Sequence, residues 1–365
     1  MALQGVMDAL KKATLEEIGI SLSLADILRD IQINGTDVKV VLFSPSEKYH
    51  EFLANKAKEV LTGLGATSVE VEFTDQPPTQ QQQPPQPPPQ ANPFETRRRI
   101  PGVKKVIAVA SGKGGVGKST VAVNLAAALK QKGYNVGYLD ADMYGPSGPT
   151  MLGAKDKTVR AKQTERGEVL IAPESHGIKL MSIGLLLPSE DTPVIWRGPV
   201  LFKALTQFLF DIDWGDEELD YLIIDLPPGT GDVQITLGQT AEIDGAVIVT
   251  TPQDVALIDV KKGIQMFNEV QIPVLGIVEN MSYFVCPDTG KAYEIFGKSK
   301  TEEIAKQYGT KLLGKVPIEP KVAEFADLGI PITIAKPDSD SAKAFMEIAD
   351  NVIRELTKQQ GGNQS

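Results

Sequence analysis

The sequence has 365 residues, a formal net charge of −10 and a single cysteine, and these values exclude several classes of protein. The length allows two or three domains with sizeable cores, and the acidic balance argues against broad nucleic-acid binding, which needs a basic surface. One cysteine allows no internal disulfide and is typical of a reducing compartment, and no apolar run approaches the roughly twenty residues of a membrane span. The N-terminus lacks the pattern of a secretory signal, so we expect a cytoplasmic protein that binds neither nucleic acid nor membranes.

The first 75 residues are expected to form a small α/β domain. Apolar residues at helical spacing predict a helix on each side of a hairpin, and alternating apolar residues predict a last strand. The hairpin is indicated by Asn34-Gly35, a pair that suits a two-residue turn between strands. We interpret this domain as a docking or regulatory module. The expected helices are residues 6–18 and 47–64, and the expected strands are residues 27–33, 38–43 and 69–73.

Residues 76–97 are expected to form a linker. Almost all of residues 76–93 are proline or glutamine, which cannot bury apolar surface, and the prolines favour an extended conformation. A semi-rigid spacer is therefore favoured over a site for polyproline-binding partners. Arg97, Arg98 and Arg99 follow at the edge of the second domain, and we expect them to form a solvated basic patch.

Residues 98–365 alternate apolar runs with helical stretches, which indicates a mostly parallel, doubly wound α/β sheet covered by helices on both faces. The last helix carries one apolar stripe and a polar face of mixed charge, so we expect it to pack on the core and not on a membrane. Strands are expected at residues 106–110, 136–140, 180–183, 221–225, 246–250, 274–278 and 312–316. Helices are expected at residues 119–130, 199–210, 255–268, 299–308, 322–328 and 339–357.

The stretch SGKGGVGKST, residues 111–120, joins the first strand of this second domain to its first helix. It has the spacing and the flanks of a phosphate-binding loop, in which glycines let backbone N–H groups converge on a phosphate chain at the positive end of a helix. Lys118 is expected to reach the β- and γ-phosphates, Ser119 to bind Mg²⁺ and Thr120 to lie near the α-phosphate. The fold class expected is therefore an α/β P-loop NTPase sheet preceded by a small α/β domain. The predicted ATP-binding residues of the loop are Gly112, Lys113, Gly114, Gly115, Val116, Gly117, Lys118, Ser119 and Thr120.

Carboxylates end two further strands. Asp140 and Asp142 lie at the carboxyl end of one strand, where α/β sheets place their sites, and Asp225 ends an apolar run in the Walker B pattern. We expect Asp225 to hold Mg²⁺ together with Ser119, Asp140 to support the ion through water, and Asp142 to position the attacking water. A role in a helix cap or a turn is the alternative for Asp140 and Asp142. The constrained stretch PPGTG at residues 227–231 is suited to sensing hydrolysis.

Lys113 makes the loop GKGGVGK, which resembles the deviant Walker A motif of the MinD/ParA/ArsA and nitrogenase-iron-protein ATPases. In that group the extra lysine reaches across a dimer interface to the partner's nucleotide. The N-terminal domain resembles, by its element order, the small domain often fused to iron–sulfur assembly ATPases. That domain often has Cys-Pro after its second strand, where this chain has Ser44-Pro45, so no cysteine-based role is expected for it.

Several motifs together resemble the Mrp/ApbC family over about residues 100–340. Members of that family are described as dimeric ATPases that carry iron–sulfur clusters and pass them to apoproteins. The resemblance implies ATP and Mg²⁺ as ligands, a homodimer, and apo iron–sulfur clients and an assembly scaffold as partners. It also implies that Asn280 recognises the adenine edge and that Pro317 packs on the base, although an asparagine capping the strand end is the alternative for Asn280. The motifs are GKGGVGKST, DADMYGPS, WRGP (residues 196–199), DLPPGTGD, TTPQ (residues 250–253) and ENMSYFVCP.

One position departs from that family. The family usually has Cys-x-x-Cys after ENMSYF, so that two thiolates from each subunit hold a [4Fe–4S] cluster across the dimer. Here Cys286 matches the first cysteine and Thr289 occupies the second position. Because a cubane cluster normally takes four thiolates, a symmetric dimer would supply only two, and Asp288, Tyr293 or an external thiol would have to complete the set. The alternatives are that no cluster binds, or that Cys286 is only a small buried residue.

The leading hypothesis is a homodimeric, Mg-ATP-dependent iron–sulfur cluster carrier with slow hydrolysis, in which Lys113, Lys118 and Asp142 are catalytic. One rival is a positioning ATPase of the MinD/ParA type, which the acidic composition and the absence of a membrane-binding helix disfavour. The other rival is an ATPase scaffold for metalloprotein maturation that holds no cluster, and the missing second cysteine supports it.

Overall fold

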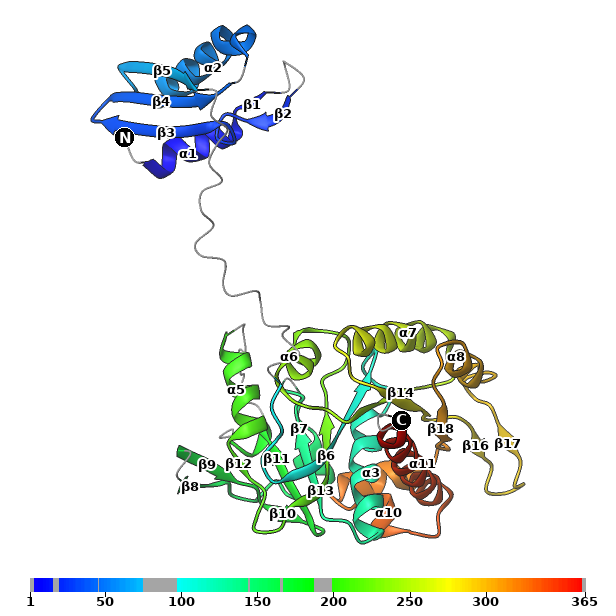
Figure 1. Cartoon of the computed structure of the whole chain (residues 1–365). Coiled ribbons are helices and arrows are strands. Elements are labelled where there is room, and N and C mark those ends of the chain that lie inside the picture. The colour runs from blue at the N-terminus through cyan, green and yellow to red at the C-terminus, as the bar shows by residue number, and fades with distance from the viewer. Residues whose placement is uncertain are drawn as a thin grey trace. The chain divides into compact units, whose positions relative to one another are not determined.

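The structure is a computed structural model, which describes residues 3–15, 20–44, 46–74, 97–143, 145–164, 167–186 and 199–362. The chain forms two compact units, Met1–Gln90 and Ala91–Ser365 (Figure 1). Apart from Arg97, the expected linker lies outside the described residues, as do Trp196, Arg197 and Gly198 of the WRGP motif. The two units are therefore considered one at a time.

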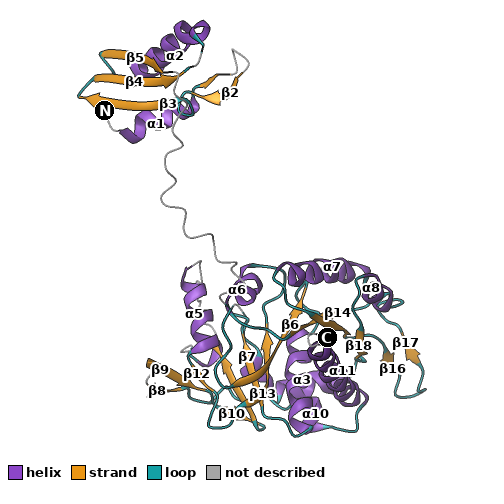
Figure 2. Ribbon diagram, viewed as in Figure 1, coloured by secondary structure: helices purple, strands orange, loops and turns teal. Residues whose placement is uncertain are grey.

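The N-terminal unit is a small sheet with helices. Its larger sheet has the order β3-β4-β5, in which β3 and β4 are antiparallel and β4 and β5 are parallel (Figure 2). Alternate residues of β4 point into the core, where Val38, Val40 and Leu42 pack against Leu53 and Leu61 of α2. The elements are α1 Leu3–Lys12, β1 Thr14–Leu15, β2 Ile20–Ser23, β3 Leu28–Asn34, β4 Asp37–Phe43, the short 3₁₀ helix Glu47–Tyr49, α2 His50–Gly63 and β5 Ser68–Thr74.

Two details of this unit differ from the sequence-based expectation. The hairpin is present, but Asn34 pairs with Asp37, so its two loop residues are Gly35 and Thr36, with Gly35 at φ +67°. The first helix ends at Lys12 instead of residue 18, because Thr14–Leu15 leaves the helix and pairs with β2. Leu15 is buried in this strand, and because an apolar residue is expected at a buried position of a helix as well, its apolar character did not distinguish the two.

The second unit is built on a sheet that, among the described residues, has eight strands in the order β10-β11-β7-β13-β6-β14-β15-β18. All neighbouring strands are parallel except the edge pair β10 and β11. Each of the apolar runs expected to be strands forms one of them, which confirms the mostly parallel α/β sheet. The strands are β6 Val103–Ser111, β7 Val136–Asp140, β10 Glu174–Ser175, β11 Ile178–Ser182, β13 Leu219–Asp225, β14 Gly245–Thr250, β15 Val274–Glu279 and β18 Leu312–Lys315.

Helices cover both faces of this sheet, as a doubly wound fold requires. Along β6, Ala108 belongs to the core under α5, α6 and α7, whereas its neighbours Ile107 and Val109 belong to the core under α3 and α11. The alternation follows from strand geometry, because successive side chains point to opposite faces. The helices are α3 Lys118–Gln131, α4 Gly148–Met151, α5 Pro199–Phe210, α6 Asp232–Thr240, α7 Asp254–Glu269, α8 Thr301–Gln307, α9 Pro320–Asp327, α10 Ile332–Ala335 and α11 Asp340–Gly362.

Several short elements of this unit have no counterpart among the expected ones. The strand β8 is exposed along almost its whole length and carries mostly polar residues, so no apolar run marks it. The β16–β17 hairpin has two residues in each strand, which is too short for a detectable period. These elements are β8 Arg160–Thr164, β9 Gly167–Ile171 and β12 Ile212–Asp213, which form a separate sheet, the hairpin β16 Phe284–Val285 and β17 Ala292–Tyr293, and the 3₁₀ helix Ile183–Leu185.

The arginines that follow the linker are not simply a solvated patch. The Arg97 guanidinium donates to the carbonyl of Val270, at the C-terminal end of α7, where a cation is favourable. The Arg98 guanidinium lies 3.9 Å from the centre of the Phe210 ring. Arg99 donates to the Glu242 carboxylate at 3.1 Å, so all three side chains have partners within the second unit.

The last helix packs on the core, as expected. Phe345, Ile348, Ala349 and Val352 of α11 are fully buried against α3 and β18. Within the described part of the chain, no helix has the length and apolar character to cross a membrane.

This packing gives a test of the fold. We expect Phe345→Ala to lower the free energy of unfolding by about 3–5 kcal/mol, because it removes a large, fully buried ring. Leu328→Ala is the control: Leu328 is 63% exposed, and its loss should change stability by no more than about 0.5 kcal/mol. Urea unfolding followed by tryptophan fluorescence measures this unit alone, because both tryptophans, Trp196 and Trp214, belong to it. Equal losses in the two variants would contradict the packing described.

Candidate functional site

The P-loop leaves β6 at the centre of the sheet and enters α3, with Gly117 at φ +79° immediately before the helix. Glycine is required at two of its positions. A Cβ on Gly112 would lie 2.2 Å from Cβ of Asp259 in α7, and a Cβ on Gly117 would lie 2.2 Å from Nδ2 of Asn280. The loop is therefore confined between α7 and the turn after β15, with the first backbone N–H groups of α3 at its end.

Lys118 is held next to the Walker B carboxylate. Its side chain is only 6% exposed, and its ammonium donates to Asp225 and, at 3.2 Å, to the Ser119 hydroxyl. The second oxygen of the fully buried Asp225 accepts a hydrogen bond of 3.0 Å from the Tyr138 hydroxyl. The structure thus brings Lys118, Ser119 and Asp225 together, as the motifs predicted, and adds Tyr138, which the sequence analysis missed because it lies inside an ordinary apolar strand.

Asp140 adds a second buried carboxylate to this site. Its Oδ2 accepts from the backbone N–H of Gly148 at 2.8 Å, and its Oδ1 accepts from the N–H of Asp142 at 3.1 Å. Burial, together with the negative charge of Asp225, raises the pKa of Asp140 to about 7, against the opposing effect of these hydrogen bonds. Burial and the same carboxylate raise the pKa of Tyr138 well above its ordinary value. Asp140 therefore organises a turn, as the alternative interpretation has it, and also adds negative charge to the site.

The chemistry of this donor set fits a magnesium ion. Two buried carboxylates and the Ser119 hydroxyl offer the hard oxygen ligands that Mg²⁺ prefers. Burial first, and then the charge of Asp225, raise the pKa of Asp140, and a divalent cation would offset both the burial of the charge and the repulsion between the two carboxylates. The three residues proposed for Mg²⁺ therefore suit the ion in type and in charge.

The other predicted catalytic residues are Asp142, which follows β7, and Lys113, which belongs to the P-loop. Asp142 is partly exposed, and its Oδ1 accepts from the N–H of Gly145 at 3.3 Å. The Lys113 ammonium lies 3.4 Å from Oε1 of Gln253, just before α7, and the Lys113 carbonyl accepts from the Ser111 hydroxyl at 2.9 Å. Their catalytic roles remain predictions.

The loop after β13 is braced against the P-loop. The N–H of Gly229 donates to the Ser111 carbonyl at 2.8 Å. Gln234 of α6 is 1% exposed, and its amide donates to the carbonyls of Pro227 at 2.8 Å and Gly229 at 3.0 Å. Sequence reasoning missed Gln234, and the only signal was a polar residue on the apolar side of an unrecognised short helix.

Asn280 lies beside the P-loop, and Pro317 lies in the segment that follows β18. The Asn280 amide is 5% exposed and donates to the Val116 carbonyl at 2.9 Å. Pro317 is flanked by two hydrogen bonds: Val316 N–H donates to the Glu279 carbonyl at 2.9 Å and Ile318 N–H to the Tyr283 carbonyl at 2.7 Å. The structure thus gives Asn280 a bracing role, and its recognition of adenine stays a prediction.

Cys286 directly follows β16, at the start of the loop that joins the two strands of the β16–β17 hairpin. Its backbone N–H donates to the Lys291 carbonyl at 2.9 Å, and it is half-buried, so the interpretation as a buried small residue is wrong. Hydrogen bonds from the Thr289 hydroxyl and from the backbone N–H groups of Asp288 and Thr289 lower the pKa of its thiol. Among the residues that the structure describes, no group of three or more His, Cys, Asp and Glu could hold a metal ion, so a metal at Cys286 needs ligands from elsewhere.

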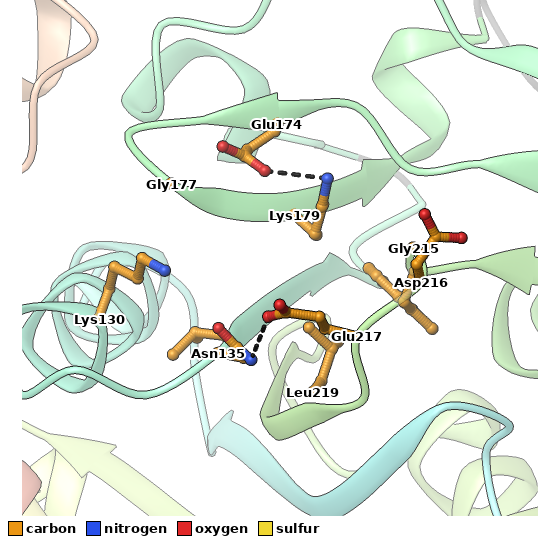
Figure 3. Close-up of a pocket in the computed structure, with 11 residues that line it drawn as sticks. Lys130, Asn135, Glu174, Gly177, Lys179, Gly215, Asp216, Glu217 and Leu219 are labelled. Atoms are coloured by element: carbon orange, nitrogen blue, oxygen red, sulfur yellow. Dashed lines mark hydrogen bonds and ion pairs between the residues drawn. The ribbon is translucent and has the colours of Figure 1, made fainter.

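A cavity of about 390 Å³ lies at the end of the sheet opposite to the P-loop, where the strands begin. Figure 3 shows Lys130, Asn135 and Glu217 around it, and its lining includes none of the P-loop, Walker B or Cys286 residues. It opens at the amino ends of β7, β11 and β13. Because ligands of open α/β sheets bind at the carboxyl ends of the strands, this cavity is not the candidate site.

Comparisons with known proteins agree with this geometry. The family model described as "ParA: NUBPL iron-transfer P-loop NTPase" matches residues 102–353. The "Iron-sulfur cluster carrier protein" of Aquifex aeolicus is 54% identical over 96% of this chain and 97% of its own, and that of Synechocystis is 44% identical over 98% of each.

Two solved structures have a similar fold. A nucleotide-binding protein from Archaeoglobus fulgidus in complex with ADP has a TM-score of 0.58 and 39% identity, covering 68% of this chain and 94% of that one. The cell division ATPase MinD of Pyrococcus furiosus has a TM-score of 0.50 and 23% identity, covering 68% and 98%, and shows the fold alone. The family match and the relatives lead to one conclusion: the chain belongs to the ParA/NUBPL iron-transfer P-loop NTPases, the group of iron–sulfur cluster carriers that its resemblance to the Mrp/ApbC family implied.

Proposed function

We propose that this chain, as a cytoplasmic homodimer, binds Mg-ATP, hydrolyses it slowly, and carries an iron–sulfur cluster that it passes to apo client proteins. The observation that carries the proposal is the presence, in one unit, of a buried P-loop site and a half-exposed thiol with a lowered pKa. The names of the curated relatives support the cargo, and the Archaeoglobus structure supports a nucleotide at the loop.

The residues of the loop suit the binding of a triphosphate. The N–H groups at the start of α3 and the Lys118 ammonium would neutralise the phosphate oxygens, and Lys118 would turn from Asp225 toward them. Mg²⁺, held by Ser119 and Asp225 with support from Asp140, would supply further charge neutralisation. Asp142 would orient the attacking water, and Lys113 would reach the nucleotide of a partner subunit.

The Cys286 thiol suits an iron–sulfur cluster that is held by few protein ligands. Two Cys286 thiolates from a dimer are fewer than the four that a cubane cluster normally takes, so the remaining ligands would come from an external thiol, a client, an assembly scaffold, or Asp288 and Tyr293. A cluster with exchangeable ligands is readily transferred. The shortage of thiolates, two per dimer in place of four, also favours the second candidate function, an ATPase scaffold for metalloprotein maturation that holds no cluster.

The hydrolysis step can be tested at Lys118. We expect Lys118→Ala to lower kcat for ATP hydrolysis by about a hundredfold or more, because the lysine stabilises charge on the transferred phosphoryl group. Steady-state phosphate release measures the rate. Lys104→Ala is the matched control, since Lys104 pairs with Asp220 at 2.9 Å and takes no part in the site. Full hydrolysis by Lys118→Ala would refute the proposed mechanism.

Nucleotide binding can be tested at Gly117. A methyl group there would collide with Asn280, so we expect Gly117→Ala to weaken the binding of a fluorescent ATP analogue by about tenfold or more. Gly133→Ala provides the comparison, because Gly133 also has a positive φ of +89°, but a methyl group on it would have nothing within 4 Å. Similar affinities for the two variants would show that the contact between the P-loop and Asn280 is unimportant for binding.

The cargo can be tested by anaerobic reconstitution with iron and sulfide. We expect the wild type to acquire iron, sulfide and visible absorption, and Cys286→Ser to acquire none, because it lacks the only thiolate of the chain. Thiolates are the ordinary ligands of such clusters, so Thr289→Cys, which restores the second position of the family motif, should raise the iron retained per chain by about twofold.

The possible outcomes separate the candidate functions. A cluster in the wild type that Cys286→Ser loses supports the carrier. No cluster in wild type or in Cys286→Ser, with ATP hydrolysis intact, would contradict the carrier and support the scaffold.

A further inference from the structure

A turn of four residues, Glu279 to Ser282, begins at the last residue of β15, and its two middle residues contact the P-loop. The Asn280 amide donates to the Val116 carbonyl at 2.9 Å. The position of a Cβ on Gly117 lies 2.2 Å from Asn280 Nδ2 and 3.5 Å from Met281 Cε. Met281 has a φ of +53°, which is costly for a residue with a side chain. A change in P-loop conformation therefore acts directly on this turn.

The first and last residues of the turn hold the segment that carries Cys286, which we call the Cys286 segment and define as residues 283–298. The Glu279 carboxylate is fully buried. It accepts hydrogen bonds from the hydroxyls of Ser282, Ser299 and Thr301. Because Ser282 precedes the segment and Ser299 follows it, one carboxylate joins both of its ends.

Little else described in the structure restrains this segment. Residues 287–298 are all exposed. At its start, Tyr283 accepts from the N–H of Ile318 at 2.7 Å, and Phe284 forms an isolated bridge with Ile318. A buried carboxylate is stable only when its charge is met by donors, and Glu279 has three hydroxyls and the Lys315 ammonium at 3.9 Å. The position of the segment therefore depends on Glu279.

We propose that Glu279 is a positioning residue that couples nucleotide occupancy of the P-loop to the reactivity of the Cys286 thiol. The inference rests on the proposed function, since it takes the P-loop as the ATP site and Cys286 as the working thiol. A nucleotide that reshapes the loop displaces Asn280 and Met281, and the turn transmits the displacement to the hydroxyls that fix the Cys286 segment. For equilibrium binding such coupling is reciprocal: a nucleotide that changes the affinity of Cys286 for a bound group has its own affinity changed by that group by the same factor.

The full-length chain offers a direct assay, because Cys286 is its only cysteine and alkylation by iodoacetamide reports that thiol alone. The rate of alkylation is measured without nucleotide and with saturating Mg-ADP or a non-hydrolysable ATP analogue. In the wild type, we expect nucleotide to change this rate by about fivefold or more. The quantity compared between variants is the ratio of the faster to the slower of these two rates, with and without nucleotide. Glu279→Gln keeps the shape of the side chain but loses its charge and one acceptor, so this ratio should fall to within about twofold of one.

This ratio separates coupling from a merely structural role. A structural role would change both rates together and leave their ratio unaltered. The matched control is Glu242→Gln, the same substitution at an exposed carboxylate that pairs with Arg99 at 3.1 Å, and it should keep the wild-type ratio. Ser299→Ala, which removes one donor to Glu279, should reduce the ratio and serves as the second variant if Glu279→Gln does not fold.

A wild-type ratio of one would overturn the proposal, and so would an undiminished ratio in Glu279→Gln or, if that variant does not fold, in Ser299→Ala. The assay uses no iron, so failure to reconstitute a cluster would refute the carrier function without touching this result. Failure of the wild type to bind the fluorescent ATP analogue would contradict both the proposed function and the proposed coupling.

Discussion

The ion pair between Lys118 and Asp225 is the interaction on which the rest of the site depends. The Asp225 side chain is fully buried and that of Lys118 almost so. Burying two charges is favourable only when each is paired and its remaining hydrogen-bonding groups have partners. Meeting that condition requires β13 to lie next to β6, which precedes the P-loop, and next to β7, which supplies Tyr138. Since a buried ion pair contributes little net stability, stability alone does not account for this pair, and under the proposed function it would hold ready a lysine that a phosphate can recruit.

The sheet and the main motif residues were predictable, because their signals are local. Parallel strands buried on both faces read as continuous apolar runs, and a carboxylate that ends such a run lies at the carboxyl edge wherever the strand falls in the sheet. Strand β13 with Asp225 and strand β7 with Asp140 are examples. The strand order itself had no local signal, because it depends on which crossover packs on which face.

The supporting contacts were not predictable, because they join residues distant in sequence. Glu279 meets Ser299 and Thr301, and Gln234 reaches back to the loop after β13, with no periodicity that marks either set. The arginines at the end of the linker were mistaken for a solvated patch because nothing in their local sequence identifies the end of α7 or the Phe210 ring as their partners.

The contrast between the two parts of the site has a physical consequence. The P-loop and Walker B residues are fixed by a sheet buried on both faces. Most of the Cys286 segment, residues 287–298, is exposed, so it belongs to the part of the fold that opens at least cost. A thiol that must pass a cargo to another protein has to be accessible, yet free motion would remove any link to the nucleotide. Under the proposed coupling, fixing both ends of the segment to one buried carboxylate meets both requirements, because the thiol stays partly exposed while the ends of the segment are hydrogen-bonded to the turn beside the P-loop.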